Sequence, residues 1–245
     1  CSGLTSITLP SSVISIENRA FISCANLTTV TMESANPPTL GDEIFKNTTS
    51  LNTILVPAGR VDAYKQAWNE HADKIQEGPY GYCGAEDNTG GVESVKWVFN
   101  PTTGTLTISG TGAMKDYGIA DTDTADTPWK DYKNDIKKIV IGKEITSIGT
   151  YNFALLPNLE NITFEENSQL KIIGRHAFYN SGFTNITIPA SVTTIDVGAF
   201  VACSSLTKVT FAKNSKLERI GTTAFSVCSG LTSITLPSSV ISIEN

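Results

Sequence analysis

Hydrophobic positions recur along the chain in a fixed order, and at six places an aliphatic residue is followed five positions later by phenylalanine. The six pairs are Ile16/Phe21, Leu40/Phe45, Ile148/Phe153, Ile173/Phe178, Ile195/Phe200 and Ile220/Phe225. Successive phenylalanines stand 22 to 25 residues apart within each run. A unit this short cannot bury its own apolar side, so the units are expected to stack into a solenoid with a continuous core.

One repeat, from Cys203 to Phe225, shows the pattern of a single rung of this solenoid. Its apolar positions are Leu206, Val209 and Phe211, then Leu217 and Ile220, and finally Phe225. The first three predict a strand with one buried side, the next two a second short buried stretch, and the phenylalanine a turn. Phe178 and Phe183 are one residue closer together in sequence than the turn phenylalanine and the next apolar residue are in the neighbouring rungs. This shorter spacing predicts a tighter turn there.

Two segments interrupt the repeat and have the patterns of caps. One has apolar residues at steps of three and four, typical of one helix face: Val61, Tyr64, Trp68, Ala72 and Ile75. The other alternates on both sides of a turn at residues 100–104, which predicts a hairpin with one apolar face: Val95, Trp97, Phe99, Leu106 and Ile108. We therefore predict a mostly-β solenoid of the α/β repeat class, with an amphipathic helix covering one end and a β-hairpin covering the other.

The repeat is specific enough to resemble a known family. Residues 1–18, continued by Arg19-Ala20-Phe21 and Cys24, resemble the repeat of the BspA-like leucine-rich repeat proteins of bacteria. Residues 97–114 with Pro128-Trp129 are similar to that family's amino-terminal cap, and residues 56–65 to its carboxy-terminal end. The resemblance implies a leucine-rich-repeat solenoid that is secreted or attached to the bacterial cell surface, with adhesion to host matrix proteins in some members and no catalytic residues.

These pieces occur in an unusual order, since the end-like segment precedes the start-like one. We predict a carboxy-terminal part of one repeat unit ending in a helical cap (1–78), a linker (79–94), the hairpin cap of a second unit (95–135) and further leucine-rich repeats (136–245). Residues 1–18 and 228–245 are identical. Two explanations remain open, namely a stretch taken across the seam of a tandem array and an engineered or misordered arrangement.

The same order is expected to leave the rungs at both ends of the chain uncapped. Each would expose an apolar face that a solenoid normally covers. The two faces should be complementary, which predicts self-association by head-to-tail contact or by domain exchange between chains.

Composition limits the partners that this chain can have. It is 40% apolar and 17% charged, with a net charge of −6 and no basic run. A nucleic-acid partner is therefore not expected. No stretch approaches the roughly 18 apolar residues that a membrane helix needs, so we predict no membrane span in this sequence.

Five cysteines raise the question of disulfide or metal chemistry. Cys1, Cys24, Cys203 and Cys228 occupy one position of the rung, where other rungs have Leu156, Ser181 and Thr48. A position that accepts all these residue types is predicted to be a small buried slot holding a free thiol. Cys83 lies in the predicted linker and is expected to be the more reactive thiol.

The sequence contains no convincing catalytic, cofactor or metal site. His71 and His176 are predicted to lie at the surface, and neither has a Ser or Cys at the spacing of a nucleophile pair. The acidic residues Asp121, Asp123 and Asp126 could supply oxygen ligands to calcium. Because no glycine or terminal Glu follows at loop spacing, a solvated loop is the preferred interpretation.

The remaining candidate for function is the exposed side of the predicted strands. One outward position is threonine in six rungs, namely Thr8, Thr31, Thr163, Thr187, Thr210 and Thr235, and the neighbouring column includes Asn161, Asn185 and Lys208. Threonine also simply suits a half-buried strand. We expect a non-enzymatic recognition or adhesion module that binds a host extracellular matrix protein or a glycan through this face. The alternative is a structural array that assembles head to tail, and an enzyme is the least supported interpretation.

Overall fold

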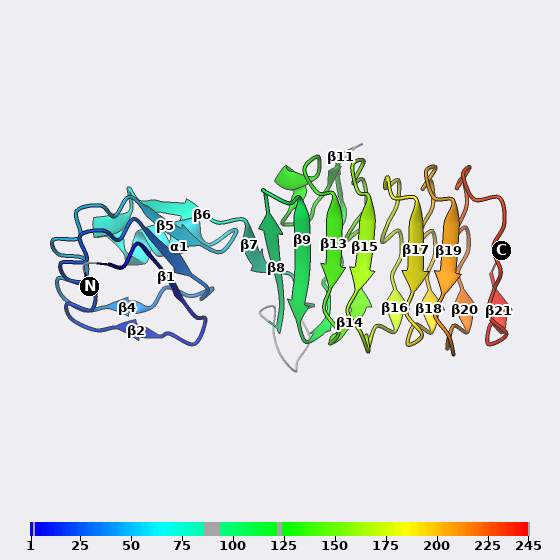
Figure 1. Ribbon diagram of the computed structural model, residues 1–245, viewed down its shortest axis with the longest axis horizontal. Helices are drawn as coiled ribbons and strands as arrows, with labels where there is room; N and C mark the ends of the chain where they lie inside the picture. Colours follow the sequence, from blue (N-terminus) through cyan, green and yellow to red (C-terminus); the bar gives the residue numbers. More distant parts are fainter. Residues whose placement is uncertain (2, 86–93, 122–123, 245) are drawn as a thin grey trace. The chain divides into compact units, whose positions relative to one another are not determined.

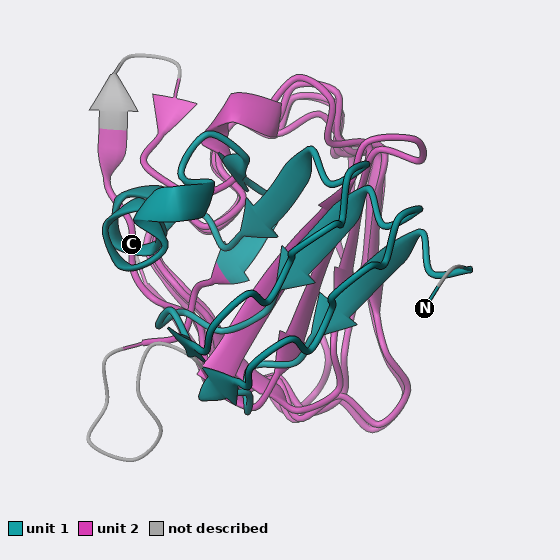
Figure 2. Ribbon diagram, turned by 90° about the vertical axis from the view of Figure 1, so that its left-hand side faces the viewer, with its two compact units in different colours: residues 1–81 teal, residues 82–245 magenta. Residues whose placement is uncertain are grey.

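The computed structural model of the chain describes residues 1, 3–85, 94–121 and 124–244. The chain forms two compact units that divide between Gly81 and Tyr82 (Figure 2). Within each unit, short strands from successive repeats lie side by side (Figure 1). The fold is a mostly-β solenoid with few helices, as the sequence predicts.

The first unit stacks its longer strands in the order β1, β3, β5, β6, all of them parallel. The short strands β2 and β4 form a second parallel ladder. The bounds of its elements are β1 Ser6–Leu9, β2 Ser15–Ile16, β3 Thr29–Met32, β4 Thr39–Leu40, β5 Thr53–Val56, α1 Val61–Ala67, the 3-10 helix η1 Asn69–His71 and β6 Ile75–Glu77.

The described part of the second unit contains four ladders, with strand orders β15-β13-β9-β8-β7, β17-β19, β10-β14-β16-β18-β20-β21 and β11-β12. Strands β8 and β9 pair antiparallel, as does the small β11–β12 pair, whereas β9, β13 and β15 are parallel. The boundary between the units falls within β7. The bounds are β7 Tyr80–Tyr82, β8 Val95–Asn100, β9 Thr105–Gly110, β10 Gly112–Ala113, β11 Ile119–Asp121, β12 Thr124–Ala125, η3 Lys130–Tyr132, β13 Lys138–Ile141, β14 Ile145–Ile148, β15 Asn161–Phe164, β16 Ile172–Ile173, β17 Asn185–Ile188, β18 Thr194–Ile195, β19 Lys208–Phe211, β20 Arg219–Ile220 and β21 Ser242–Ile243.

The core is a set of apolar columns that run from rung to rung. Strand register places Leu106, Ile139 and Ile162 opposite one another. The first two are fully buried and the third is 9% exposed. Because side chains alternate along a strand, burying this column leaves the residues on either side of it facing out.

The phenylalanine of each rung lies in a turn whose backbone is left-handed at two positions, two residues before and two residues after the ring. These pairs are Arg19/Ser23, Glu43/Asn47, Tyr151/Leu155, His176/Asn180, Gly198/Ala202 and Thr223/Val227. Residues other than glycine rarely adopt a positive φ, yet Gly198 is the one glycine in this set. We infer that tertiary packing imposes the turn, chiefly through burial of the phenylalanine.

The phenylalanine rings stack on one another along the second unit. Ring centroids are 5.5 Å apart between Phe153 and Phe178, 5.3 Å between Phe178 and Phe200, and 5.1 Å between Phe200 and Phe225. The first three of these rings are fully buried. Stacked aromatic pairs add to the stabilisation from buried area, so this column holds successive rungs together.

One turn departs from the others, as the sequence predicts. In the other rungs, the N–H of the leucine that precedes the strand donates to a carbonyl three residues earlier, as Leu206 does to Cys203 over 3.1 Å. The shorter segment from Phe178 to Phe183 has no equivalent bond in the described chain. Strands β15 and β17, before and after this turn, belong to different ladders. The deletion of one residue therefore coincides with a break in the main ladder.

The helix near residue 61 is shorter than the sequence pattern predicts. Helix α1 ends at Ala67, and Ile75 lies in β6, where it pairs with Ile54 of β5. The prediction that Ile75 continues the helix face is wrong, because the pairing of its backbone with β5 outweighs the helical spacing of the side chains. Tyr64 and Trp68 are buried and donate hydrogen bonds of 2.8 Å to the carbonyls of Ser34 and Pro38.

Removal of one ring from the phenylalanine column should destabilise the second unit strongly. Phe200→Ala is expected to lower the free energy of unfolding by about 3–5 kcal/mol, because it leaves a cavity between two stacked rings. Urea denaturation followed by circular dichroism measures this loss. Val227→Ala, at a side chain that is 68% exposed, is the control and should change stability by less than about 0.5 kcal/mol. Equal effects of the two substitutions would contradict the role given to the column.

Candidate recognition face

The nine residues predicted to form the exposed recognition face lie partly in the first unit and partly in the second. Thr8 and Thr31 lie opposite each other on β1 and β3 of the first unit. The second unit holds the other seven residues, of which Asn161 and Thr163 lie on β15, Asn185 and Thr187 on β17, Lys208 and Thr210 on β19, and Thr235 outside the strands. All nine are exposed except Thr31, which is half-buried. We call the six residues on β15, β17 and β19 the polar face.

Alternation of side chains explains why the polar face points outward. On each of β15, β17 and β19 the two residues of the polar face flank one buried residue. These buried residues are Ile162, Ile186 and Val209, and they are at most 9% exposed. The residues on either side of each therefore project to the opposite side of the strand. On β17 and β19, register pairs Asn185 with Lys208 and Thr187 with Thr210, which aligns the two columns.

A groove of about 570 Å³ opens along this face. It is lined by residues of β15 and β17 and the loops that follow them, among them Asn161, Thr163, Asn185 and Thr187. It lies where the ladder is broken between β15 and β17. Sequence reasoning did not find this groove, although the shortened Phe178–Phe183 turn is the signal that marks its place.

The groove is lined mainly by neutral polar groups. The Thr163 hydroxyl donates to Asn161 Oδ1 over 2.9 Å, and Asn185 Nδ2 donates to the Thr184 hydroxyl over 3.2 Å. The carboxylate of Glu165 accepts a hydrogen bond from the backbone N–H of Lys143 over 3.0 Å. Hydroxyl and amide groups both donate and accept hydrogen bonds, so the face suits a partner rich in hydroxyl or peptide groups.

The position shared by the rung cysteines is a hydrogen-bonding slot. The Cys203 thiol donates to the Phe178 carbonyl of the preceding rung over 3.0 Å, and Ser181 and Thr48 make the equivalent bonds over 2.7 Å to Phe153 and Phe21. Burial is confirmed for Cys24, Cys203 and Cys228, whereas Cys1 is exposed. The common chemistry of Cys, Ser and Thr, a donor on a short side chain, could have been inferred from the sequence.

The prediction that Cys83 is the reactive thiol is wrong. Cys83 is fully buried, and its N–H donates to the Val95 carbonyl of β8 over 2.9 Å. Burial raises the pKa of the Cys83 thiol far above its usual range. The thiolate is the nucleophilic form of cysteine, so this residue is chemically protected. The sequence pattern failed here because residues assigned to a linker lie against the hairpin.

Both histidines pack against aromatic rings, which corrects their assignment as plain surface residues. The ring of His176 stacks on Tyr151 with centroids 5.0 Å apart, and His71 meets Phe45 edge-on at 5.2 Å. Each is half-buried. This burial lowers the pKa of both imidazoles, which favours their neutral form at pH 7.

The acidic segment offers no metal site that can be described. Asp123 lies outside the described residues, and Asp126 is exposed and pairs with Lys130 Nζ at 2.9 Å. Over the described ranges, no group of three or more His, Cys, Asp or Glu side chains is placed to hold a metal ion.

The helices are short and lie within the two units. Among the residues placed by the structure, none of them has the length and apolar character to cross a bilayer.

The repeated parallel rungs, the phenylalanine turns and the polar outer face define a leucine-rich-repeat solenoid. The chain matches the BspA type leucine-rich repeat region in six copies, over residues 1–76 and 131–245. It therefore belongs to this family, as the sequence resemblance predicts.

Solved structures show similarity at low identity. The pneumococcal vaccine antigen PcpA is 22% identical, with a TM-score of 0.42 over 62% of this chain and 44% of that protein. A leucine-rich repeat protein from Eubacterium ventriosum is 24% identical, with a TM-score of 0.32 over 61% and 59%. A leucine-rich cell surface protein from Faecalibacterium prausnitzii is 19% identical, with a TM-score of 0.35 over 98% and 57%. This chain covers less than two thirds of each of them, and no curated protein matches it.

The burial of the thiols predicts a simple labelling pattern. In the folded protein at about pH 8, iodoacetamide should modify Cys1 and leave Cys83 and Cys203 unmodified, because burial raises the pKa of both thiols, that of Cys203 to about 12. Peptide mass spectrometry measures the modification. All five cysteines should react after unfolding in urea. Rapid labelling of Cys83 in the folded protein would contradict its placement.

Proposed function

We propose that this chain is a non-enzymatic recognition module that binds an extracellular protein or glycan through the polar face of its second unit. The observation that carries the proposal is the groove between β15 and β17, which is lined by Asn161, Thr163, Asn185 and Thr187. These side chains are exposed and lie on strands, so their positions are set by the solenoid and not by a flexible loop.

The chemistry of the face favours hydrogen bonding over charge attraction. Of its six residues, Lys208 is the one that carries a charge. A partner with many hydroxyl or amide groups, such as a glycan or an extended peptide segment, can exchange its bonds to water for bonds to these side chains. A location on the bacterial cell surface or outside the cell forms part of the proposal, because the family resemblance implies it.

Substitution within the groove tests this function. Thr163→Lys/Thr187→Lys should weaken binding to the responsive member of a panel of fibronectin, fibrinogen and glycans by more than about tenfold, equivalent to about 1.4 kcal/mol. The long side chains would fill the groove and remove two hydroxyl groups. Surface plasmon resonance gives the dissociation constants.

A second variant adds the same charge elsewhere in the unit. Thr102→Lys/Thr223→Lys changes two exposed threonines that do not line the groove, and it should bind like the unchanged chain. If both variants lose binding equally, the effect comes from charge and not from the groove. If neither loses it, the partner binds at another surface.

A further inference from the structure

Backbone N–H groups in the phenylalanine turns hold each rung to the next. At alternate residues, the N–H groups of one turn donate to carbonyls of the turn that follows. In the first unit these bonds run from Arg19, Phe21 and Ser23 to Asp42, Ile44 and Lys46, over 3.0, 3.1 and 2.8 Å. The turns of Phe153, Phe178 and Phe200 each make the same three bonds. Each of these turns therefore presents a row of donors that a following peptide segment satisfies.

The turn of Phe45 has the same backbone conformation but lacks these acceptors. Glu43 and Asn47 are left-handed, with φ of 54° and 60°, as Arg19 and Ser23 are in the turn before. After this turn the chain continues through β5 into α1 and η1, and not into another phenylalanine turn. Among the residues that the structure places, the N–H groups of Glu43, Phe45 and Asn47 have no acceptor. The carbonyls of this turn accept bonds from the turn before it, so these N–H groups point the opposite way.

A cavity of about 900 Å³ lies between this turn and the helical segment of the first unit. Glu43 and Phe45 line one side of it, and residues 67–71, at the end of α1 and in η1, line the other. His71 meets the Phe45 ring edge-on at 5.2 Å and covers it. Within the described chain, however, the N–H groups beside the ring stay without an acceptor. The backbone edge of the turn therefore faces a space that can hold a ligand.

The charged groups of the cavity favour a cation over an anion. The Glu43 carboxylate accepts a hydrogen bond from Arg19 Nε over 2.9 Å and also pairs with Lys46, so one carboxylate engages both of these cations. The carboxylates of Asp42 and Glu70 also line the cavity. Over the described ranges, neither of them has an ion-pair partner. Two negative charges therefore remain uncompensated, and they attract a positive group.

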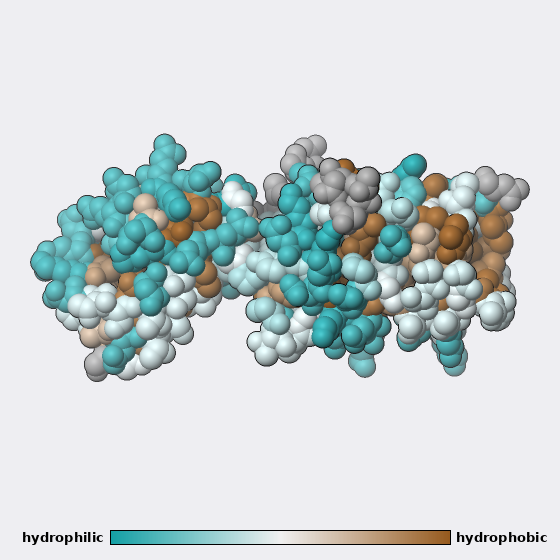
Figure 3. Space-filling view, turned by 90° about the horizontal axis from the view of Figure 1, so that it is seen from above, coloured by the Kyte–Doolittle hydropathy of each residue, from teal (hydrophilic) through white to brown (hydrophobic). Residues whose placement is uncertain are grey.

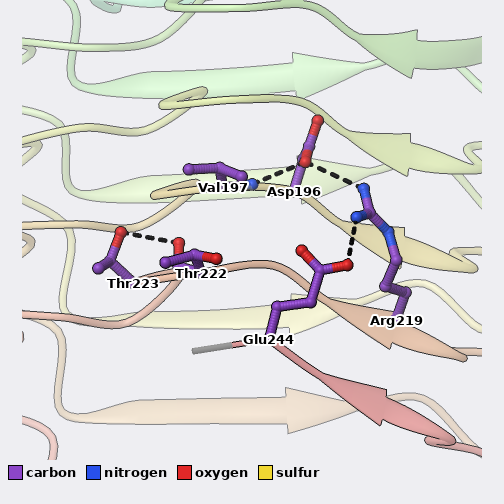
Figure 4. Close-up of polar contacts among 6 residues, drawn as sticks. All are labelled: Asp196, Val197, Arg219, Thr222, Thr223 and Glu244. Carbon is purple, nitrogen blue, oxygen red and sulfur yellow. Dashed lines mark hydrogen bonds and ion pairs between the residues drawn. The ribbon is translucent and has the colours of Figure 1, made fainter.

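The second unit shows how carboxylates of this kind are used between rungs. Arg219 lies between Asp196 of the preceding rung and Glu244 of the following one, with its Nη2 and Nη1 atoms 3.1 Å and 2.7 Å from their carboxylate oxygens (Figure 4). A basic side chain of one segment thus joins carboxylates that neighbouring segments supply. A lysine or arginine of a peptide in the cavity would find the two uncompensated carboxylates for the same purpose.

The outer surface of the first unit also favours polar contacts. On the face that Figure 3 draws, hydrophobic residues form small areas among hydrophilic ones. A partner that meets this face finds mainly groups that carry charge or form hydrogen bonds.

We propose that the N–H groups of Glu43, Phe45 and Asn47 bind main-chain carbonyls of a peptide segment of another protein, and that this segment carries lysine or arginine. The segment takes the place that the next turn has in the other rungs, so it continues the interface between rungs. Every second carbonyl of an extended peptide faces the same side, which suits donors at alternate residues. In recognition of this kind, main-chain bonds give affinity and side chains give specificity. The site belongs to the first unit and is separate from the polar face.

An anion fits the same N–H groups less well. It would accept their hydrogen bonds, but it would also meet the carboxylates of Asp42, Glu43 and Glu70. Like charges at close range repel one another, most strongly where water is partly excluded. A peptide carbonyl accepts the same bonds without a net charge.

Exchange of single amide protons tests the contact directly. The probes are acetylated and amidated hexapeptides in which Lys, Ser or Glu alternates with Val. In NMR, the Lys–Val peptide should slow exchange of the Phe45 amide by more than about tenfold. The Phe21 amide, which already donates to Ile44, should not change. The Ser–Val peptide should act more weakly and the Glu–Val peptide not at all. If no peptide slows the Phe45 amide, or if Glu–Val acts as strongly as Lys–Val, the proposal is overturned.

A matched pair of variants locates the peptide. Ala67 and Ala63 are both exposed on α1, but Ala67 lines the cavity and Ala63 does not. Ala67→Trp should fill the cavity and weaken binding of the Lys–Val peptide by more than about tenfold in titration calorimetry. Ala63→Trp should bind it like the unchanged chain. Equal affinity in all three chains would place the peptide elsewhere, and equal loss in both variants would assign the effect to the helix. Either result contradicts the proposed site.

Two non-peptide probes separate the contributions of charge and of the carbonyls. Inorganic phosphate offers acceptor oxygens with a negative charge, and spermine offers positive charge without a carbonyl. Neither should slow exchange of the Phe45 amide. A slowing by phosphate equal to that by the Lys–Val peptide would identify an anion site, and the same result with spermine would show that charge alone suffices. Each of these outcomes would rule out recognition through peptide carbonyls.

Discussion

Hydrogen bonds between successive rungs are the interaction on which this structure depends. A strand of four residues has no hydrogen-bonding partner within its own rung, so its backbone is satisfied by the rungs on either side. The bonds beside the strands run both ways, since the Gly174 N–H donates to Ile148 of the preceding rung and the Ile54 N–H to Lys74 of the following one, whereas in the phenylalanine turns the N–H donates to the following rung, as Phe200 does to Ala224. Each rung is therefore held by its neighbours on both sides. Apolar burial adds stability to this arrangement, and the backbone sets its spacing.

Much of the fold follows from positions that the sequence states directly. The recurrence of phenylalanine specifies the repeat length, and the apolar triplets specify which side of each strand is buried. The position shared by Cys203, Ser181 and Thr48 was correctly placed in the interior. Its hydrogen bond to the preceding rung does not follow from side-chain size, because the bond needs the donor that Cys, Ser and Thr share. The outward position of the polar face follows from the same alternation of side chains.

Contacts between segments that do not repeat could not be obtained in this way. The helical spacing that runs to Ile75 competes with pairing of its backbone to β5, and local periodicity does not show which prevails. Cys83 resembles a linker residue in sequence, but the hairpin strand β8 covers it. The groove depends on the absence of pairing between β15 and β17, which depends on turn geometry. Each of these cases is decided by which backbone groups find partners.

The shortened turn between Phe178 and Phe183 shows how a regular array can gain a distinct surface without a new side chain. Asn-x-Thr occurs on β15 and again on β17, so composition does not distinguish these rungs. What distinguishes them is the removal of one residue from the turn between them, which coincides with a break between two ladders and with a polar groove at that break. In a repeat protein of this kind, length variation in the turns is therefore a route to new binding specificity that leaves every core position intact, and it would escape a comparison based on residue identity alone.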